Sequence, residues 1–212
     1  MQIYSAQIQA AAGKGGETGA LVAQTRDALA AATGQPFYGW SVAAGAPVGS
    51  FVISTRVDGT AQLLDVQQKM AESSEFQQLG PKYSGLAAAP AETQLVDIIG
   101  TTGEMVEPKP VVVVTNSGIG SSAPGGLNAA LAWSNSVLER AGAVTGASGF
   151  LGLSAAGPLY QVTWIFGADT GAQMDEMNAA LGGDAEFAAM LDGGGGLFIP
   201  GSAQRVIMAQ LP

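Results

Sequence analysis

Two periods of apolar residues follow each other at the start of this chain. Residues 3–10 alternate between polar and apolar side chains, which is typical of a strand with one buried face. Residues 18–33 instead place apolar side chains at helical spacing, so we expect a helix that Thr18 caps and Gly34 ends. The chain therefore opens with a strand and an amphipathic helix.

A hairpin and a second helix come next. Residues 37–43 and 50–57 are rich in β-branched and aromatic residues, and the segment 44–49 between them has the composition of a turn. Asp58 then stands where an N-cap is expected. We therefore predict a hairpin followed by a helix from Asp58 to about Leu79.

The same order of elements occurs twice. A strand at 93–99 ends the first set, which then reads β-α-β-β-α-β. The second set consists of a strand at 111–116, a small-residue loop at 117–126, a helix at 127–141, a hairpin at 149–155 and 159–167, a helix from Asp169 to about Leu191, and a strand at 204–211. Each set matches the ferredoxin-like unit, a four-stranded antiparallel sheet with two helices on one face.

A sequence repeat supports this division. Identical residues stand 111 positions apart in the second helix of each set, at Asp58 and Asp169, Ala61 and Ala172, Gln62 and Gln173, Glu75 and Glu186, and Phe76 and Phe187. Self-similarity of this kind indicates an internal duplication. We therefore divide the chain into a first ferredoxin-like repeat at 1–100, a linker at 101–109 and a second ferredoxin-like repeat at 110–212.

One ferredoxin-like unit leaves the second face of its sheet bare, and two units can bury those faces together. We therefore expect an α+β fold of two tandem repeats packed sheet-to-sheet as an intramolecular α+β barrel. In its strand-helix order, and in the Asp-x-x-Ala-Gln … Glu-Phe-x-x-Leu/Met helix of each half, the chain resembles the dimeric α+β barrel superfamily in its tandem form. Antibiotic-biosynthesis-monooxygenase-like and NIPSNAP-like proteins are the nearest relatives in pattern.

Charged residues are scarce. They make up 12% of the 212 residues, whereas hydrophobic residues make up 47%. Part of the surface must then be apolar, so we expect contacts with another protein chain, a homo-oligomer among them. The formal net charge is −9 and the basic residues are scattered. We expect no nucleic acid as a partner, because phosphates require clustered Lys and Arg.

Histidine and cysteine are both absent. Their absence excludes disulfides, thiolate nucleophiles, Ser-His-Asp triads and histidine-ligated zinc or haem. An all-oxygen magnesium or calcium site stays open, but the closely spaced acidic residues that usually mark one are missing. We therefore expect neither a metal nor a cofactor.

No segment has the pattern of a membrane span or a signal peptide. The longest strongly apolar run, 110–115, is far too short to cross a bilayer, and residues 1–9 lack a basic region and an apolar region. We therefore expect a cytoplasmic protein without membrane insertion.

Two charged residues interrupt otherwise apolar strands. Arg56 falls on the opposite face of its strand from Phe51 and Ile53, which we expect to pack on helices. Asp97 lies among the apolar residues of a later strand. The two could serve as an anion-orienting guanidinium and a catalytic carboxylate, or they could form a structural ion pair, which is the commoner arrangement.

Four aromatic residues gather on the two predicted hairpins: Tyr38, Trp40, Tyr160 and Trp164. They could line a pocket for a flat apolar ligand, although large core and interface residues are commoner. Asn116 precedes a glycine-containing segment that resembles a phosphate loop only loosely, because no Lys follows it and the parallel βαβ context is missing. We keep these five residues, with Arg56 and Asp97, as candidates for ligand binding.

Three classes of function fit these observations. The resemblance implies a cofactor-independent monooxygenase-like enzyme that acts on an aromatic or polyketide-like substrate. A non-catalytic protein that binds a small apolar molecule, and an accessory subunit that binds a partner chain, are the other two classes. No group of residues demands catalysis, so we rank a binding or accessory role above an enzyme.

Overall fold

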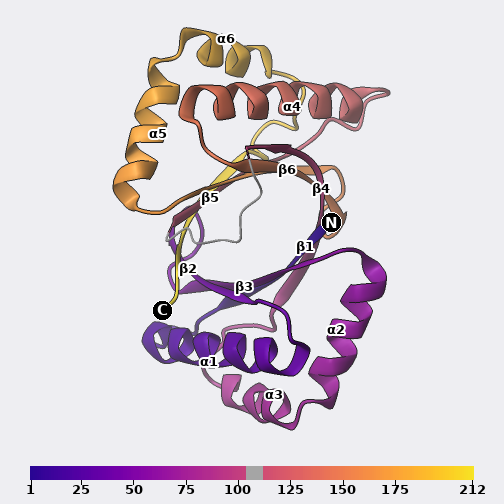
Figure 1. Cartoon of the computed structure of the whole chain (residues 1–212), viewed down its shortest axis with the longest axis vertical. Coiled ribbons are helices and arrows are strands. Elements are labelled where there is room, and N and C mark those ends of the chain that lie inside the picture. The colour runs from indigo at the N-terminus through magenta and orange to yellow at the C-terminus, as the bar shows by residue number, and fades with distance from the viewer. Residues whose placement is uncertain (104–111) are drawn as a thin grey trace. The chain divides into compact units, whose positions relative to one another are not determined.

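The computed structural model describes residues 1–103 and 112–212. The first set of elements is β1 Gln2–Gln9, α1 Gly15–Thr33, β2 Tyr38–Ala44, β3 Ser50–Val57, α2 Thr60–Glu72, α3 Ser74–Leu79, the 3-10 helix η1 Gly80–Tyr83 and β4 Glu92–Thr102. The second set is β5 Val112–Ile119, α4 Gly126–Thr145, β6 Gly149–Ala156, β7 Gln161–Ala168, α5 Gly171–Gly183, α6 Ala185–Gly193 and β8 Gln204–Gln210 (Figure 1).

The strands form a closed barrel in the hydrogen-bonded order β1-β3-β2-β8-β5-β7-β6-β4, which confirms the predicted α+β barrel class. By their internal contacts the residues divide into unit 1, Met1–Val96 with Met208–Pro212, and unit 2, Asp97–Ile207. Most of the predicted linker, residues 104–109, lies outside the described residues, and its first two residues belong to β4. No described helix has both the length and the apolar composition needed to cross a bilayer.

One face of the sheet in unit 1 is buried beneath helices. β3 pairs antiparallel with β1 and with β2, so its alternate residues point to opposite faces. Phe51, Ile53 and Val57 pack in one core with α1 and α2, where Val22 and Val66 are fully buried. Figure 1 shows α1 and α2 on the same side of β3. This is the face that the alternation of β3 predicts.

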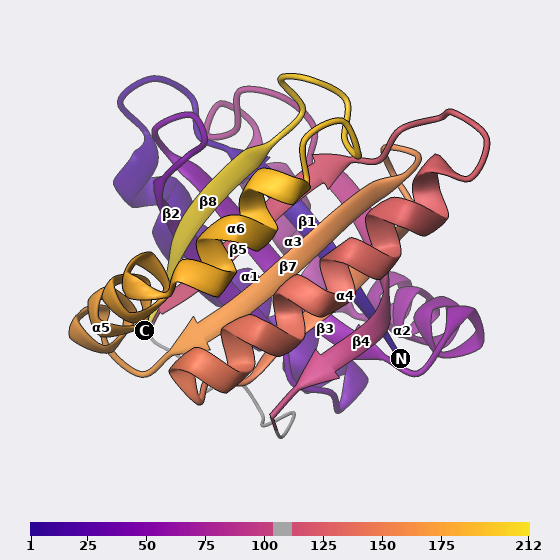
Figure 2. The ribbon, with the colours of Figure 1, turned by 90° about the horizontal axis from the view of Figure 1, so that it is seen from above.

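Unit 2 buries the corresponding face beneath α4. Leu151 of β6 and Trp164 of β7 pair in register and pack with Leu138 of α4. Trp133 and Phe198 join this cluster, and the ring centroids of Trp133 and Trp164 lie 5.9 Å apart in an edge-to-face arrangement. Figure 2 shows α4 running along β7. We call this side of each sheet its helix-covered face.

The second helix of each half does not begin as the sequence analysis predicted. α2 begins at Thr60, and the side-chain oxygen of Gln62 accepts a hydrogen bond from the amide of Asp58 at 2.5 Å. Gln173 makes the same contact with Asp169 at 2.7 Å. In each repeat the side chain of the glutamine therefore satisfies a backbone N–H, that of the aspartate, which has no partner within the helix. The side chain of the aspartate does not cap the helix.

Each helix predicted to be long is divided in two. Ser73 separates α2 from α3, and its hydroxyl accepts a hydrogen bond from the amide of Phe76 at 3.2 Å. Asp184 separates α5 from α6 and accepts from the amide of Phe187 at 2.7 Å. Ser and Asp are strong N-cap residues because their side chains satisfy such amides. The repeated Glu-Phe pair thus marks the start of a new helix.

α1 begins earlier than its predicted cap. The helix starts at Gly15, and Thr18 lies inside it, where the hydroxyl donates to the carbonyl of Leu86 at 3.1 Å. Gly34 ends the helix as predicted, with a φ of 72°. The side chain of Thr18 therefore ties α1 to the loop before β4.

β5 extends further than its composition suggests. The strand continues to Ile119, so the first residues of the loop predicted at 117–126 are paired with β7, and residue 111 lies outside the described residues. At Gly118 an added Cβ would lie 3.0 Å from the ring of Phe198. The small residue leaves room for that ring, which explains why a glycine stands at this position of the strand.

The two units fill the space beside their first helix in different ways. In unit 1, Tyr83 packs on α1 and shares a 2.8 Å hydrogen bond with Thr25. The residue 111 positions later is Gly194, and a Cβ there would overlap the ring of Trp133. The indole of Trp133 also donates to the carbonyl of Met190 at 2.8 Å. Tyr83 of η1 thus fills this space in unit 1, and Trp133 of α4 fills it in unit 2.

An ion pair fixes α6 of unit 2 to α4. Arg140 donates to both carboxylate oxygens of Asp184, at 3.0 and 2.6 Å, and to Glu186 at 2.8 Å. The hydrogen bonds from Arg140 and from the amide of Phe187 hold the pKa of Asp184 below its ordinary value. The charged carboxylate therefore serves as both the N-cap of α6 and the partner of α4.

We expect Asp184→Asn to lower the melting temperature by a few degrees at pH 7. Because the folded-state pKa is lowered, the stabilisation is present above the unfolded-state pKa of about 3.9 and is lost as the pH falls through the folded-state value. Circular dichroism melts from pH 7 to pH 2.5 should therefore show the two proteins converging below about pH 4. Asp175→Asn, an exposed position on α5, is the control. An equal difference at every pH would contradict the role of the charge.

We expect Gly194→Ala to destabilise the protein by about 1–3 kcal/mol, since the new Cβ overfills the space that Trp133 occupies. Urea unfolding measures the effect. Gly193→Ala is the matched control, because no atom lies within 4 Å of its added Cβ, and it should be neutral or slightly stabilising. Trp133→Leu in the Gly194→Ala background should recover part of the loss; additive losses would contradict the packing argument.

Candidate functional site

The face of the unit 1 sheet that points away from α1 and α2 carries polar and aromatic side chains. We call it the helix-free face, and on β2 and β3 it consists of Tyr38, Trp40, Val52, Ser54 and Arg56. Tyr38 lies opposite Ser54, and Trp40 lies opposite Val52. Residues directly opposite each other share a face of the sheet. The strand register therefore brings these side chains together.

Trp40 has a fixed orientation on this face. Its indole nitrogen donates a hydrogen bond to the hydroxyl of Ser54 at 3.0 Å. The ring centroids of Tyr38 and Trp40 lie 6.3 Å apart with an interplanar angle of 36°. Trp40 is only 4% exposed, and a buried indole N–H needs an acceptor. The face thus holds an aromatic pair whose geometry is set by one hydroxyl.

Arg56 continues the helix-free face along β3. Ile3 of β1 lies directly opposite it, whereas the next residue, Val57, is buried among the helices. Arg56 therefore faces away from the helices, as the alternation predicts. Asp97, the other charged candidate, lies in β4 and belongs to unit 2. Both residues are half-buried.

The equivalent face of unit 2 lacks these groups. Phe150 and Gly152 stand where unit 1 has Tyr38 and Trp40, because the second hairpin is one residue shorter and Gly152 lies opposite Thr163 as Trp40 lies opposite Val52. In the same way Ile165 and Gly167 replace Ser54 and Arg56. The phenol, indole and guanidinium of this face thus occur in one repeat alone.

Trp164 and Asn116 point to the helix-covered face of unit 2. The two residues pair in register, and the indole nitrogen of Trp164 donates to the carbonyl of Ser134 in α4 at 3.1 Å. Trp40 and Trp164 therefore lie on opposite faces of their own sheets. Asn116 lies within β5 and not in a loop.

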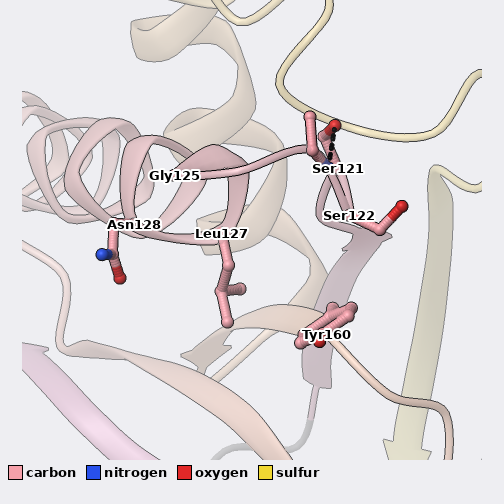
Figure 3. Close-up of a pocket in the computed structure, with 7 residues that line it drawn as sticks. Ser121, Ser122, Gly125, Leu127, Asn128 and Tyr160 are labelled. Carbon is pink, nitrogen blue, oxygen red and sulfur yellow. Dashed lines mark hydrogen bonds between the residues drawn. The ribbon is translucent and has the colours of Figure 1, made fainter.

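Tyr160 is placed in a shallow pocket of unit 2 with a volume of about 210 Å³. The pocket is lined by Ser121, Ser122, Ala123, Gly125, Leu127, Asn128 and Tyr160 (Figure 3). Leu127 and the carbonyl of Tyr160 both lie about 3.5 Å from the point where Gly120 would place a Cβ. Ser121 is already engaged, since its hydroxyl accepts from the amide of Ala123 at 3.3 Å.

The backbone of Tyr160 is strained. Its φ is 60°, which makes it the single residue other than glycine with a positive φ among residues 1–103 and 112–212. A side chain in this left-handed region costs roughly 1–2 kcal/mol, because Cβ approaches the backbone oxygen. Strain of this kind is concentrated at functional sites. Tyr160 is also 44% exposed and is one of the exposed large side chains of unit 2.

The two phenols with shifted acidity lie elsewhere. Burial raises the pKa of Tyr4, which packs in the core of unit 1. Burial also raises the pKa of Tyr83, and the hydrogen bond from Thr25 offsets part of that rise. Both phenols lie on the helix side of unit 1. They are therefore not groups that would exchange a proton at the helix-free face.

Sequence reasoning missed Ser54 and the residues around Tyr160. Ser54 could have been found, because an inward-facing Trp on a neighbouring strand needs a hydrogen-bond acceptor. Ser122 and Leu127 carry no such signal, since they come to Tyr160 from a segment far away in the sequence. Only the folded chain brings these segments together.

No family model and no curated protein matches the sequence. Several solved structures share its fold. A candidate monooxygenase from Fusobacterium nucleatum has a TM-score of 0.72 at 8% identity, over 100% of this chain and 92% of that one. An anthrone oxidase-like protein has a TM-score of 0.65 at 13% identity, over 100% and 91% of the two chains.

A third similar structure is a major regulator of staphylococcal pathogenesis, with a TM-score of 0.54 at 11% identity over 99% of each chain. The chain therefore shares the α+β barrel fold of these structures, which is the fold that its sequence pattern predicts. At these identities the likeness extends to the fold alone, and the fold hosts different roles. Function has to be argued from the residues of this chain.

Proposed function

We propose that this protein binds a small, flat aromatic molecule without transforming it, and that the helix-free face of unit 1 is the binding site. One observation carries the proposal: Tyr38, Trp40, Ser54 and Arg56 share this face, and the equivalent positions of unit 2 lack their chemistry. A sheet face that served only to fill space would need neither a guanidinium nor a paired indole.

The residues suggest the chemistry of the ligand. The rings of Tyr38 and Trp40 favour offset or edge-to-face contact with an aromatic system. Arg56 favours an anionic or strongly polarised oxygen, because its donors form charge-assisted hydrogen bonds. Trp40 is almost fully buried and forms the base of the site. Tyr38, Ser54 and Arg56 are half-buried. A polycyclic aromatic molecule with one acidic oxygen fits these groups best.

We expect Arg56→Ala to weaken binding of 9-anthracenecarboxylate about 10-fold to 100-fold, because a hydrogen bond to a charged group contributes about 1.5–3 kcal/mol. Isothermal titration calorimetry measures the change, with neutral anthrone as the paired ligand, whose affinity should change far less. Arg205→Ala is the matched control, since Arg205 is an exposed strand residue bonded to Asn178 at 2.8 Å.

The alternative is a structural role for Arg56. In that case Arg56→Ala would lower the melting temperature and leave the affinity for both ligands unchanged. Failure of the unsubstituted protein to bind either ligand would refute the proposed site itself.

A catalytic role is the second candidate, and the anthrone oxidase-like neighbour favours it. The reaction would oxidise a methylene group between two aromatic rings to a carbonyl with one molecule of O₂. One oxygen atom enters the carbonyl and the other leaves as water with the two methylene hydrogens, so the substrate supplies all four electrons. Arg56 would stabilise the oxyanion that forms when the methylene loses its proton.

Oxygen uptake separates the two candidates. With anthrone at pH 7, an enzyme would consume O₂ faster than the protein-free solution, and Arg56→Ala would lower the rate at least 10-fold. A rate equal to spontaneous oxidation would leave the binding role.

An accessory role is favoured by exposed apolar residues at the tips of both hairpins. Val48 is 98% exposed and Leu159 is 77% exposed. Apolar side chains in this position are typical of contacts with another chain or a second copy. Native mass spectrometry of the protein purified from its own host reports bound small molecules and bound chains together. A bare monomer would count against both the binding and the accessory role.

A further inference from the structure

The two hairpin turns follow the same backbone path. Pro47 accepts a hydrogen bond from the amide of Ser50 at 3.2 Å, and Pro158 accepts from the amide of Gln161 at 3.4 Å. The carbonyl of Gly49 accepts from the amide of Ala10, and that of Tyr160 accepts from the amide of Gly120, each at 2.9 Å. Gly49 and Tyr160 stand 111 positions apart and are therefore equivalent residues.

The two equivalent residues also share the left-handed conformation, with φ of 83° at Gly49 and 60° at Tyr160. Turns that need a positive φ at their third residue favour glycine there. Unit 1 has that residue, whereas unit 2 has a large aromatic one. The fold can plainly form this turn with glycine, so the turn itself does not require the tyrosine.

Core packing does not account for the tyrosine either. Tyr160 is 44% exposed, and it belongs to none of the hydrophobic clusters of unit 2. It lies instead at the pocket with Ser122 and Leu127 (Figure 3). A strained residue that the turn does not need, and that the core does not bury, is most simply explained by what it offers to a ligand.

We propose that this pocket is a second binding site, which takes a small, uncharged, planar molecule that carries a hydrogen-bonding group, such as an aromatic amide or a phenol. The ring of Tyr160 and the side chain of Leu127 supply apolar contact. The hydroxyl of Ser122 and the amide of Asn128 supply hydrogen bonds. The volume is below the roughly 300–1,000 Å³ of sites for drug-sized ligands, so the molecule is of about one ring.

We infer an uncharged ligand from the uncharged residues around the pocket. None of its lining residues is charged. The lining residues come from the sequence stretches 112–138 and 141–168, and the carbonyl of Leu197, in the stretch 193–204, accepts from the amide of Ser121. None of these three stretches contains Asp, Glu, Lys or Arg. A charged ligand would lose hydration there without gaining an oppositely charged partner. The site therefore favours an uncharged ligand over its ionised analogue.

The experiment uses ligand-observed saturation-transfer NMR on the full chain, with benzamide as the neutral probe and benzoate as its charged analogue. Unsubstituted protein should give a saturable benzamide signal and at least 10-fold weaker binding of benzoate. Tyr160→Gly should lower the benzamide affinity at least 10-fold, with a melting temperature equal to or above that of the unsubstituted protein. Leu159→Ala, the exposed neighbour in the same turn that does not line the pocket, should leave binding unchanged.

Four results would overturn the proposal. They are no benzamide binding, benzamide binding that survives Tyr160→Gly, benzoate binding as tight as benzamide, and a lower melting temperature of Tyr160→Gly, which would make the ring a packing group. Arg205→Ala, at an exposed strand residue outside both proposed sites, should also leave benzamide binding unchanged. The second site and the proposed site in unit 1 are tested with different ligands and different variants, so they can fail independently.

Discussion

Each sheet buries one of its faces beneath its own helices, and this one-sided burial governs the rest of the structure. Val57 and Val66 in unit 1, and Leu138 and Leu151 in unit 2, are almost fully enclosed. Burial of such side chains contributes roughly 1.5–3 kcal/mol each, and a shift of strand register by one residue would move Val57 or Leu151 to the other face of its sheet. The core thus fixes the strand register, and the register determines which side chains lie on the face away from the helices.

The duplication preserves backbone hydrogen bonds and lets side chains differ. The amides of Asp58 and Asp169 bond to equivalent glutamines, and the carbonyls of Gly49 and Tyr160 accept from equivalent amides. Trp40, where the other unit has glycine, differs within that common framework. Each repeat therefore serves as a control for the other, because a difference at equivalent backbone positions is not required by the fold. Both proposed sites contain such differences.

The order of elements, the repeat and the position of Arg56 on the helix-free face could be predicted, because strand alternation and helical spacing are local patterns. The division of the helices at Ser73 and Asp184 could not be predicted, because the pattern of apolar residues continues across both breaks. The two side chains act as caps only once the chain has turned at these residues. The different faces of Trp40 and Trp164 could not be predicted for a related reason. Both residues lie on hairpins, but their positions in the strand differ by one step and send them to opposite faces.

The sequence by itself determined the repeated β-α-β-β-α-β architecture and excluded histidine and cysteine chemistry, since composition and periodicity need no knowledge of distant contacts. Only the tertiary structure decided that Trp40 pairs with Ser54, that Trp164 is a packing residue, and that Tyr160 is held in a strained turn beside Leu127. Each of these depends on strand register or on segments that are far apart along the chain. Contacts of this kind form only when the chain folds, because the free energy of burial then offsets the loss of chain entropy. No local run of residues determines them.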